Sequence, residues 1–258
     1  MGVIRTDKWL IDSYHKPIKI CEKIRMHFND ASAADIYDYL ISHGMYHPIR
    51  NGDIVVDKLQ KNKVWKIVQD ENLQLQKAWD GPNIPIFIFP SAANNRILNQ
   101  DFNGKSGLAF KDKLFLFIAD TNTEMEIRAL LTHEYNHVCR LSKYKKNEED
   151  YVLLDTIILE GIAENAVRER FGDRLLARWT SYYSNDKIKH MWSNVIFPNR
   201  NISKSDREHQ NILYGLRSHP KMLGYCVGFY LVKKYMEATN KSCKDLLNIE
   251  TNTIAQLD

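Results

Sequence analysis

The stretch L-T-H-E-Y-N-H-V-C-R-L, residues 131–141, limits the possible folds of this chain more than any other part of its sequence. His133 and His137 are four residues apart, and Glu134 directly follows the first of them. Positions four apart on an α-helix lie one turn from each other on the same face, so both imidazoles can bind one metal ion. The spacing therefore predicts a helix with a metal-binding face. The alternative is a polar seam between helices, with Glu134 exposed to solvent.

The residues before this stretch change from a helical to a β-strand pattern. Apolar residues have helical spacing in residues 33–41 and 55–79. Residues 84–90 are β-branched or aromatic and are bounded by prolines, which is typical of a strand near a sheet edge. Residues 107–110 and 114–119 flank a short polar turn and predict a hairpin. We therefore expect helices and a small antiparallel or mixed sheet in the first half.

From residue 123 onward the pattern is almost wholly helical. Thr123 and Glu126 form a capping box, which predicts that a helix begins about ten residues before His133. The sequence thus predicts an α+β fold, with a mixed α/β subdomain at residues 1–122 and a mostly helical subdomain at residues 123–258. The two subdomains are expected to work as one unit.

Composition restricts the class of protein and its partners. With 258 residues, an apolar fraction of 44% and a charged fraction of 26%, the chain has the composition of an ordinary globular protein. Its 36 basic and 32 acidic residues are spread along the chain without long blocks, which argues against nucleic acid as a partner. The most apolar stretch, residues 222–232, is too short to span a bilayer. We therefore expect no nucleic-acid partner and no membrane partner.

Cysteine usage and the first residues predict the compartment. The four cysteines are far apart and form no C-x-x-C motif, which argues against a disulfide framework and against a thiol-rich zinc knuckle. The first ten residues lack the apolar run that is typical of a signal peptide. Together these features predict a cytoplasmic protein. They do not indicate whether it oligomerises.

A second helical pattern, residues 151–171, offers a further metal ligand. Glu160 and Glu164 are four residues apart and border its apolar stripe, an expensive place for two carboxylates unless a positive charge lies nearby. A zinc ion would supply that charge, and a catalytic zinc site needs three protein ligands and an open fourth position. Gly161 lowers helix stability by about 1 kcal/mol relative to alanine, so we expect it to allow close approach by a neighbouring helix.

These two motifs together resemble the gluzincin metallopeptidases, in which a glutamate on a second helix is the third zinc ligand. More specifically, the chain resembles the YjaZ-type family of predicted zinc-dependent proteases. The resemblance extends over nearly the whole chain and includes the segments W-D-G-P-N-I-P-I-F-I-F-P, H-E-Y-N-H-V-C-R and L-L-D-T-I-I-L-E-G-I-A-E. It implies a zincin-like metallopeptidase fold with the active-site cleft between the two subdomains. It also implies one Zn²⁺ ion and a peptide or protein substrate.

The resemblance implies a role for each polar residue of the two helices. His133, His137 and Glu160 correspond to the zinc ligands, and Glu134 corresponds to the general base that takes a proton from the attacking water. Glu164 corresponds to an acid that supports a ligand histidine through its second nitrogen, although thermolysin-like enzymes have Asp there. The reverse assignment, with Glu164 as the ligand and Glu160 behind it, stays open.

The oxyanion formed in such a reaction needs a hydrogen-bond donor in addition to zinc. Tyr214, His219 and Tyr225 lie in the region where gluzincins often place this residue, and each is a catalytic candidate. Tyr225 can equally belong to the core, and His219 can simply end a loop before a proline. Asp155 is a further candidate for supporting the ligands, or else an exposed acid near a helix start.

Two other classes of protein share parts of this pattern. A non-catalytic zinc-binding regulatory or interaction module would keep the fold, but a structural zinc site closes its fourth position with another Cys or His and does not need Glu134. A deformylase-type hydrolase needs an upstream cysteine ligand, and Cys21 lies in no suitable motif. The sequence therefore favours a zinc metallopeptidase. We expect residues 107–110 or 114–118 to offer a sheet edge to the substrate main chain, or else only to pack on the helix.

Overall fold

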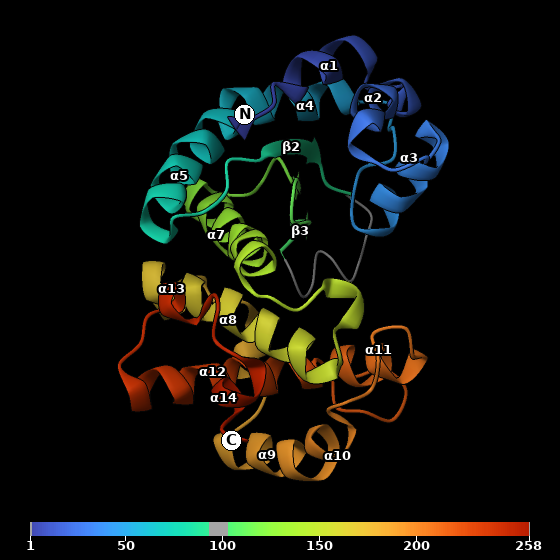
Figure 1. The fold of residues 1–258 in the computed structure, drawn as a ribbon. Helices are drawn as coiled ribbons and strands as arrows, with labels where there is room; N and C mark the ends of the chain where they lie inside the picture. The colour runs from blue at the N-terminus through green and yellow to red at the C-terminus, as the bar shows by residue number, and fades with distance from the viewer. Residues whose placement is uncertain (1, 93–102, 258) are drawn as a thin grey trace. The chain divides into compact units, whose positions relative to one another are not determined.

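The computed structural model describes residues 2–92 and 103–257 (Figure 1). The chain forms two compact units, Met1–Val138 and Cys139–Asp258, which divide inside helix α7, Glu124–Lys143. The sequence pattern itself changes from mixed to helical just before this helix begins. The fold is α+β, as predicted, because a small mixed sheet lies in the first unit and the second unit is mostly helical.

Local sequence signals mark the starts of two helices in the first unit. In chain order they are α1 (Thr6–Ser13), α2 (Pro17–Ile24), the 3-10 helix η1 (Arg25–His27), α3 (Ala33–Ser42), α4 (Gly52–Lys61) and α5 (Val64–Trp79), followed after the sheet by α7. A capping box between Ser32 and Asp35 starts α3. Pro17 starts α2, because its missing N–H would have no partner in a first turn anyway.

The sheet of the first unit has the strand order β1-β2-β4-β3. Its strands are β1 (Gly2–Val3), β2 (Pro85–Pro90), β3 (Ser106–Ala109) and β4 (Leu114–Ile118). β2 pairs in parallel with β1 and β4, and β3 pairs antiparallel with β4, so the predicted hairpin is confirmed. Every residue of β2 and β4 is buried, as expected for strands that are covered on both faces.

The predicted edge position of residues 84–90 is wrong, because β2 lies between β1 and β4 in the interior of the sheet. Pro85 and Pro90 are the first and last residues of the strand, so their missing N–H groups do not interrupt its ladder. The strand that covers its outer side, β1, has only two residues. A segment that short has no pattern from which a strand can be predicted.

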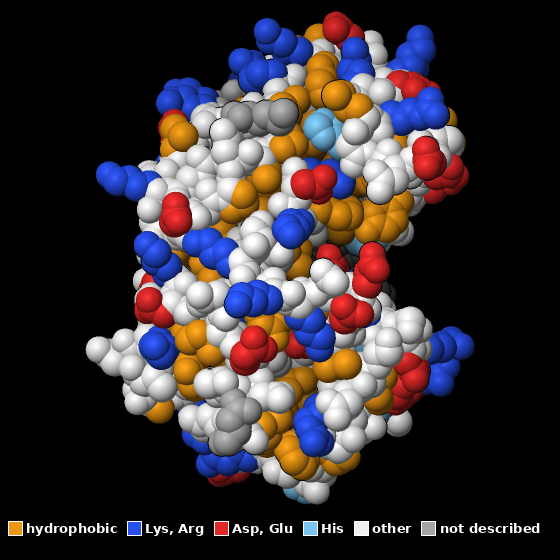
Figure 2. Space-filling view, viewed as in Figure 1, with side chains coloured by type: hydrophobic (Ala, Val, Ile, Leu, Met, Phe, Trp, Pro, Cys, Tyr) orange, Lys and Arg blue, Asp and Glu red, His pale blue; other side chains and the backbone are white. Residues whose placement is uncertain are grey.

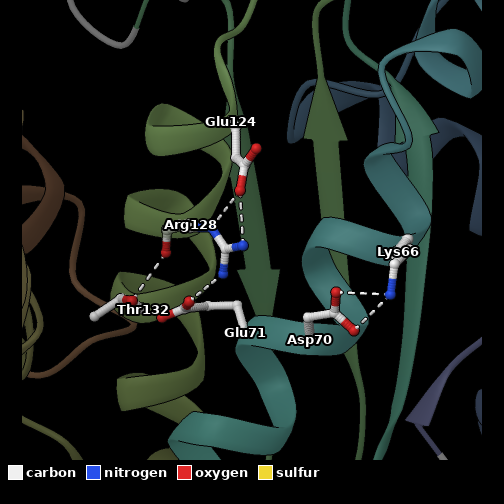
Figure 3. A network of polar contacts seen from close by, with 6 residues as sticks. All are labelled: Lys66, Asp70, Glu71, Glu124, Arg128 and Thr132. Carbon is white, nitrogen blue, oxygen red and sulfur yellow. Dashed lines mark hydrogen bonds and ion pairs between the residues drawn. The ribbon is translucent and has the colours of Figure 1, made fainter.

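Polar contacts (Figure 3) and an aromatic stack join α5 to α7 in the first unit. The guanidinium of Arg128 on α7 contacts the buried carboxylate of Glu71 on α5 and that of Glu124 on its own helix, both at 2.7 Å. Seven residues further along α7, Tyr135 stacks on Trp79 of α5 with 6.2 Å between ring centroids. These contacts hold one side of α7 against the first unit.

The second unit contains the last residues of α7 and the helices that follow it. These are α8 (Leu153–Phe171), α9 (Asn185–Met191), α10 (Phe197–Asn199), α11 (Arg207–Tyr214), α12 (Leu223–Thr239), α13 (Cys243–Leu246) and α14 (Thr251–Ala255). Short segments between them are the 3-10 helices η2 (Glu148–Asp150), η3 (Asp173–Leu175) and η4 (Arg178–Ser181) and the π-helical η5 (Trp192–Ile196). α8 is buried on nearly all sides, and α12 is its main packing partner.

Glycines let α8 and α12 approach until their backbones touch, as Gly161 predicted. A Cβ atom at Gly161 would lie 2.3 Å from the carbonyl oxygen of Gly228, and one at Gly228 would lie 2.1 Å from that of Ile157. The Asn165 side chain bridges the same crossing, because its amide donates to the carbonyl oxygens of Gly161 and Phe229 at 2.8 and 3.0 Å. The position of α8 in its unit therefore depends on the absence of side chains at this crossing.

Among the described residues, no helix combines the length and the apolar character that crossing a membrane requires. Figure 2 shows basic and acidic side chains intermixed on the face in view, with apolar groups between them.

Candidate metal centre

Helix α7 begins where the sequence predicted. The Glu126 carboxylate accepts hydrogen bonds from the N–H and the hydroxyl of Thr123 at 2.8 and 2.9 Å, which completes the capping box. Burial acts to raise the pKa of Glu126, but the hydrogen bonds from Thr123, together with the charge of Lys105 and a hydrogen bond from Asn103, lower that pKa below its ordinary value. The carboxylate therefore stays charged at the positive end of the helix that carries the predicted ligands.

His133 and His137 share one face of α7, as their spacing predicted. Their ring centroids are 4.7 Å apart and the ring planes meet at 88°. Tyr135, between them in sequence, points to the other side of the helix, where its hydroxyl donates to the carbonyl oxygen of Pro82 at 2.8 Å. Because that side is anchored in the first unit, the histidine face has a defined orientation.

Glu134 is nearly buried and lies against the backbone of β3. Only 9% of its surface is exposed. A Cβ atom at Gly107 would come within 2.3 Å of the Glu134 carboxyl carbon and within 2.7 Å of one carboxylate oxygen. Only glycine leaves room for this side chain, a requirement that the sequence patterns above did not predict. The available signal was a glycine inside a predicted strand, which often marks a close approach of another group.

Glu160 joins the two histidines as a potential ligand. Each of His133, His137 and Glu160 offers one ligand atom, and these atoms all lie within 4.8 Å of one another. Two imidazoles and one carboxylate form a donor set typical of catalytic zinc, where bonds of about 2.1 Å place tetrahedral donors about 3.4 Å apart. Side-chain rotations can close the remaining difference. The three residues therefore fit a zinc ion.

The two other acids of α8 have different surroundings. Glu164 is buried, and one of its carboxylate oxygens accepts a hydrogen bond from the Ala177 N–H at 2.6 Å. Asp155 contacts the Lys146 ammonium at 2.6 Å and accepts a hydrogen bond from the Thr251 hydroxyl at 2.8 Å. Asp155 is thus a buried acid rather than an exposed one. The supporting roles of both acids stay predictions, as does the reverse assignment of Glu160 and Glu164.

The three candidates for the oxyanion donor fall into two groups. Tyr225 is buried on α12, and its ring lies 5.6 Å from that of Tyr214. His219 instead pairs with Glu208, 2.7 Å between Nε2 and the carboxylate. Hydrogen bonds from Asn211 and His219 lower the pKa of Glu208. The catalytic roles of Tyr214, His219 and Tyr225 stay predictions.

Comparisons with known proteins place these residues in a family context. A family model with the description "Predicted Zn-dependent protease (DUF2268)" matches residues 64–256, a range that contains all the predicted ligands. "Uncharacterized protein YjaZ" of Bacillus subtilis (strain 168) is 43% identical over 218 residues, which cover 84% of this chain and 84% of that protein. "Uncharacterized protein YjfC" of the same organism is 23% identical over 136 residues, 50% of this chain and 46% of that protein. No solved structure matches the chain.

Proposed function

The chain belongs to the family of predicted Zn-dependent proteases, and we propose that it is a single-zinc metallopeptidase of the gluzincin type. One observation carries this proposal: the potential ligand atoms of His133, His137 and Glu160 lie within 4.8 Å of one another. The adjoining Glu134 supports a catalytic site rather than a structural one, because a structural zinc site has no use for a further acid beside its ligands.

The three ligand residues would hold the metal with one coordination position open. Two neutral imidazoles and one carboxylate leave the site with a net positive charge. Zn²⁺ bound there would act as a Lewis acid that polarises a peptide carbonyl and makes water a better nucleophile at neutral pH.

Glu134 would act as the general base. Its carboxylate takes a proton from the attacking water and passes it to the leaving nitrogen of the peptide. The absence of a side chain at Gly107 leaves room for this carboxylate to lie against β3 before the substrate arrives. Such preorganisation matters because a misplaced base loses much of its effect on the rate.

The sheet edge next to Glu134 supports a peptide substrate. Within the part of the chain that the structure describes, β3 pairs with β4 on one side and with no other strand. Gly107 and Ala109 are two apart, so they share the face of β3 that approaches Glu134. A substrate in extended conformation would add to β3 through main-chain hydrogen bonds, which recognise peptide without strong selection of side chains.

Two further features support the proposed compartment and class of substrate. Cys21, Cys139, Cys226 and Cys243 are all buried, and none of them forms a disulfide. Free thiols support the proposed cytoplasmic location. The intermixed surface charges favour a peptide or protein over nucleic acid as the substrate.

The proposal is tested by Glu134→Gln together with zinc analysis of the purified protein. We expect one zinc per chain in both proteins, and a loss of casein or peptide-library hydrolysis of at least about a hundredfold in the variant. Glu124→Gln, an exposed acid on the same helix, is the matched control and should keep its activity. Full activity of Glu134→Gln would contradict the mechanism. Stoichiometric zinc without hydrolysis of any library peptide would favour the non-catalytic module.

A further inference from the structure

A buried cation lies in the second unit, just after the predicted ligands of α7. Arg140 is only 2% exposed, and its Nη1 donates to the carbonyl oxygens of Leu246 and Ile249, both at 2.7 Å. Its guanidinium also stacks 3.8 Å from the ring centre of Tyr144. Burial lowers the pKa of Arg140, which shows that the charged form is held there at a cost. These two hydrogen bonds join the end of α7 to the last residue of α13 and to the segment that follows it.

The start of α8 is bound to the same C-terminal segment. Asp155 is buried, and it accepts a hydrogen bond from the hydroxyl of Thr251, the first residue of α14, at 2.8 Å. The same hydroxyl lies 3.2 Å from that of Tyr144, which donates to the Glu250 carboxylate at 3.0 Å. Lys146 closes the group with its contact to Asp155 at 2.6 Å. Thr251 therefore touches Asp155 on α8 and Tyr144, the residue that directly follows α7.

We propose that this group, the C-terminal clamp of Arg140, Tyr144, Asp155 and Thr251, sets the spacing between α7 and α8 and so positions Glu160 for metal binding. Arg140 follows His137 by three residues, and Asp155 precedes Glu160 by five. The inference rests on the proposed zinc site. Its four members are positioning residues that act through the two helices.

The connection between the helices explains why a clamp is needed. α7 ends at Lys143 and α8 begins at Leu153, and between them lies only the short η2. Such a connection does not by itself fix the distance between two helices. Metal affinity depends on ligands that are already in place, so contacts around the ligands commonly change it by about ten- to a hundredfold.

Stability alone accounts poorly for the clamp. Replacing buried charged groups by apolar residues of similar volume is often neutral or stabilising, so a buried ionic group is weak evidence for a contribution to stability. The C-terminal clamp places a buried guanidinium and a buried carboxylate where an apolar core would be simpler. A geometric task at the metal site explains their presence.

Two threonine variants separate the geometric task from plain stability. Thr251→Val removes the hydroxyl that contacts both Asp155 and Tyr144. Thr6→Val is the matched control, because Thr6 is equally buried and its hydroxyl also has two partners, the Ile88 carbonyl and the Trp65 indole, in the first unit. We expect Thr251→Val to weaken Zn²⁺ affinity about tenfold in competition with a chelating dye. Thr6→Val should lower the unfolding temperature about as much as Thr251→Val does, but it should leave the Zn²⁺ affinity unchanged.

The visible spectrum of the Co²⁺-substituted protein gives a readout that a loss of stability does not move. If Glu160 is displaced, the intensity of the cobalt bands should change in Thr251→Val and stay unchanged in Thr6→Val. Tyr144→Phe keeps the ring under Arg140 and removes only the hydroxyl, so it serves as a milder variant if Thr251→Val does not fold. It should change affinity and spectrum in the same direction.

The outcomes distinguish this inference from the proposed function. If the unaltered protein binds no zinc, the proposed function is wrong and the inference falls with it. If the protein binds zinc but Thr251→Val and Tyr144→Phe match Thr6→Val in affinity and cobalt spectrum, only the role of the C-terminal clamp is overturned.

Discussion

The two helices that carry the predicted ligands are held in opposite ways. α7 is anchored by polar groups on the side away from its histidines, where Arg128 pairs with the buried Glu71 and Tyr135 bonds to a backbone carbonyl. α8 has polar contacts as well, but its position against α12 depends on close backbone packing, because Gly161 brings its backbone against that of Gly228. The position of α7 depends on the strength of a few polar contacts. The position of α8 depends on the absence of a side chain where its backbone meets that of α12.

This difference predicts different responses to mutation. A polar anchor can be weakened in steps, and the helix keeps its remaining contacts. A close backbone contact cannot be weakened gradually, because even one added methyl group clashes with the facing helix. Substitutions at α8 should therefore cost more than conservative substitutions at the anchors of α7.

Gly161→Ala is expected to have the largest effect on stability. Its Cβ would lie 2.3 Å from a backbone oxygen, so the two helices must move apart. We expect the free energy of unfolding to fall by about 3 kcal/mol, at the upper end of the cost of overpacking. Urea denaturation of the purified protein measures this change. An unaltered denaturation midpoint would show that α8 and α12 are not in backbone contact.

Glu71→Gln tests the polar anchor of α7 and should cost less. The variant removes the negative charge of Glu71 and leaves the partly buried Arg128 with Glu124 as its only charged partner among these two acids, although the new amide oxygen can still accept a hydrogen bond. We expect a loss of about 2 kcal/mol, below the usual range for a fully buried pair. The neighbouring Asp70→Asn is the control, since its pair with Lys66 is exposed (Figure 3) and should cost less than about 0.5 kcal/mol. If both variants lose the same free energy of unfolding, the pair of Arg128 and Glu71 stabilises the protein no more than an exposed surface pair does.

The same two helices show what sequence can predict and what it cannot. The capping box at Thr123 and the spacing of His133 and His137 are local, and the structure confirms both the helix and the shared face. Glu71, which pairs with Arg128, is 57 residues away in the sequence. The need for glycine at position 107 arises only because the fold brings β3 against Glu134. Long-range packing sets such contacts, and a single sequence carries no direct signal for them.

The central position of β2 in the sheet could not be predicted from the sequence for a related reason. Prolines suggest an edge because they lack a donor, but the consequence depends on where in the ladder each proline falls. Pro85 and Pro90 fall at the two ends of the strand, and its partner β1 comes from the distant start of the chain. The fold class was predictable from local patterns, whereas the order of the strands was not.

Gly107→Ala tests whether the Glu134 carboxylate must lie against β3. The added Cβ meets the flexible end of the Glu134 side chain, so folding should change little while the carboxylate moves. We expect kcat to fall about tenfold with zinc content retained, because a displaced base transfers protons poorly. Ser106→Ala, on the opposite face of the same strand, should leave kcat unchanged. Full activity in Gly107→Ala would mean that the contact between Glu134 and β3 has no catalytic importance.

The smallest expected effect is a pH dependence of the free energy of unfolding, caused by a histidine that packs against α8. His209 on α11 is 1% exposed, and its Nε2 lies 3.1 Å from the hydroxyl of Thr156 on α8. Burial lowers the pKa of His209, so below about pH 6.5 the unfolded chain takes up the proton more readily than the folded one. Stability should thus fall by up to about 1 kcal/mol between pH 7 and pH 5.5. Urea denaturation at a series of pH values measures this change, and His209→Gln should make stability less dependent on pH in this range. If the variant and the unaltered protein show the same pH dependence, another group is responsible.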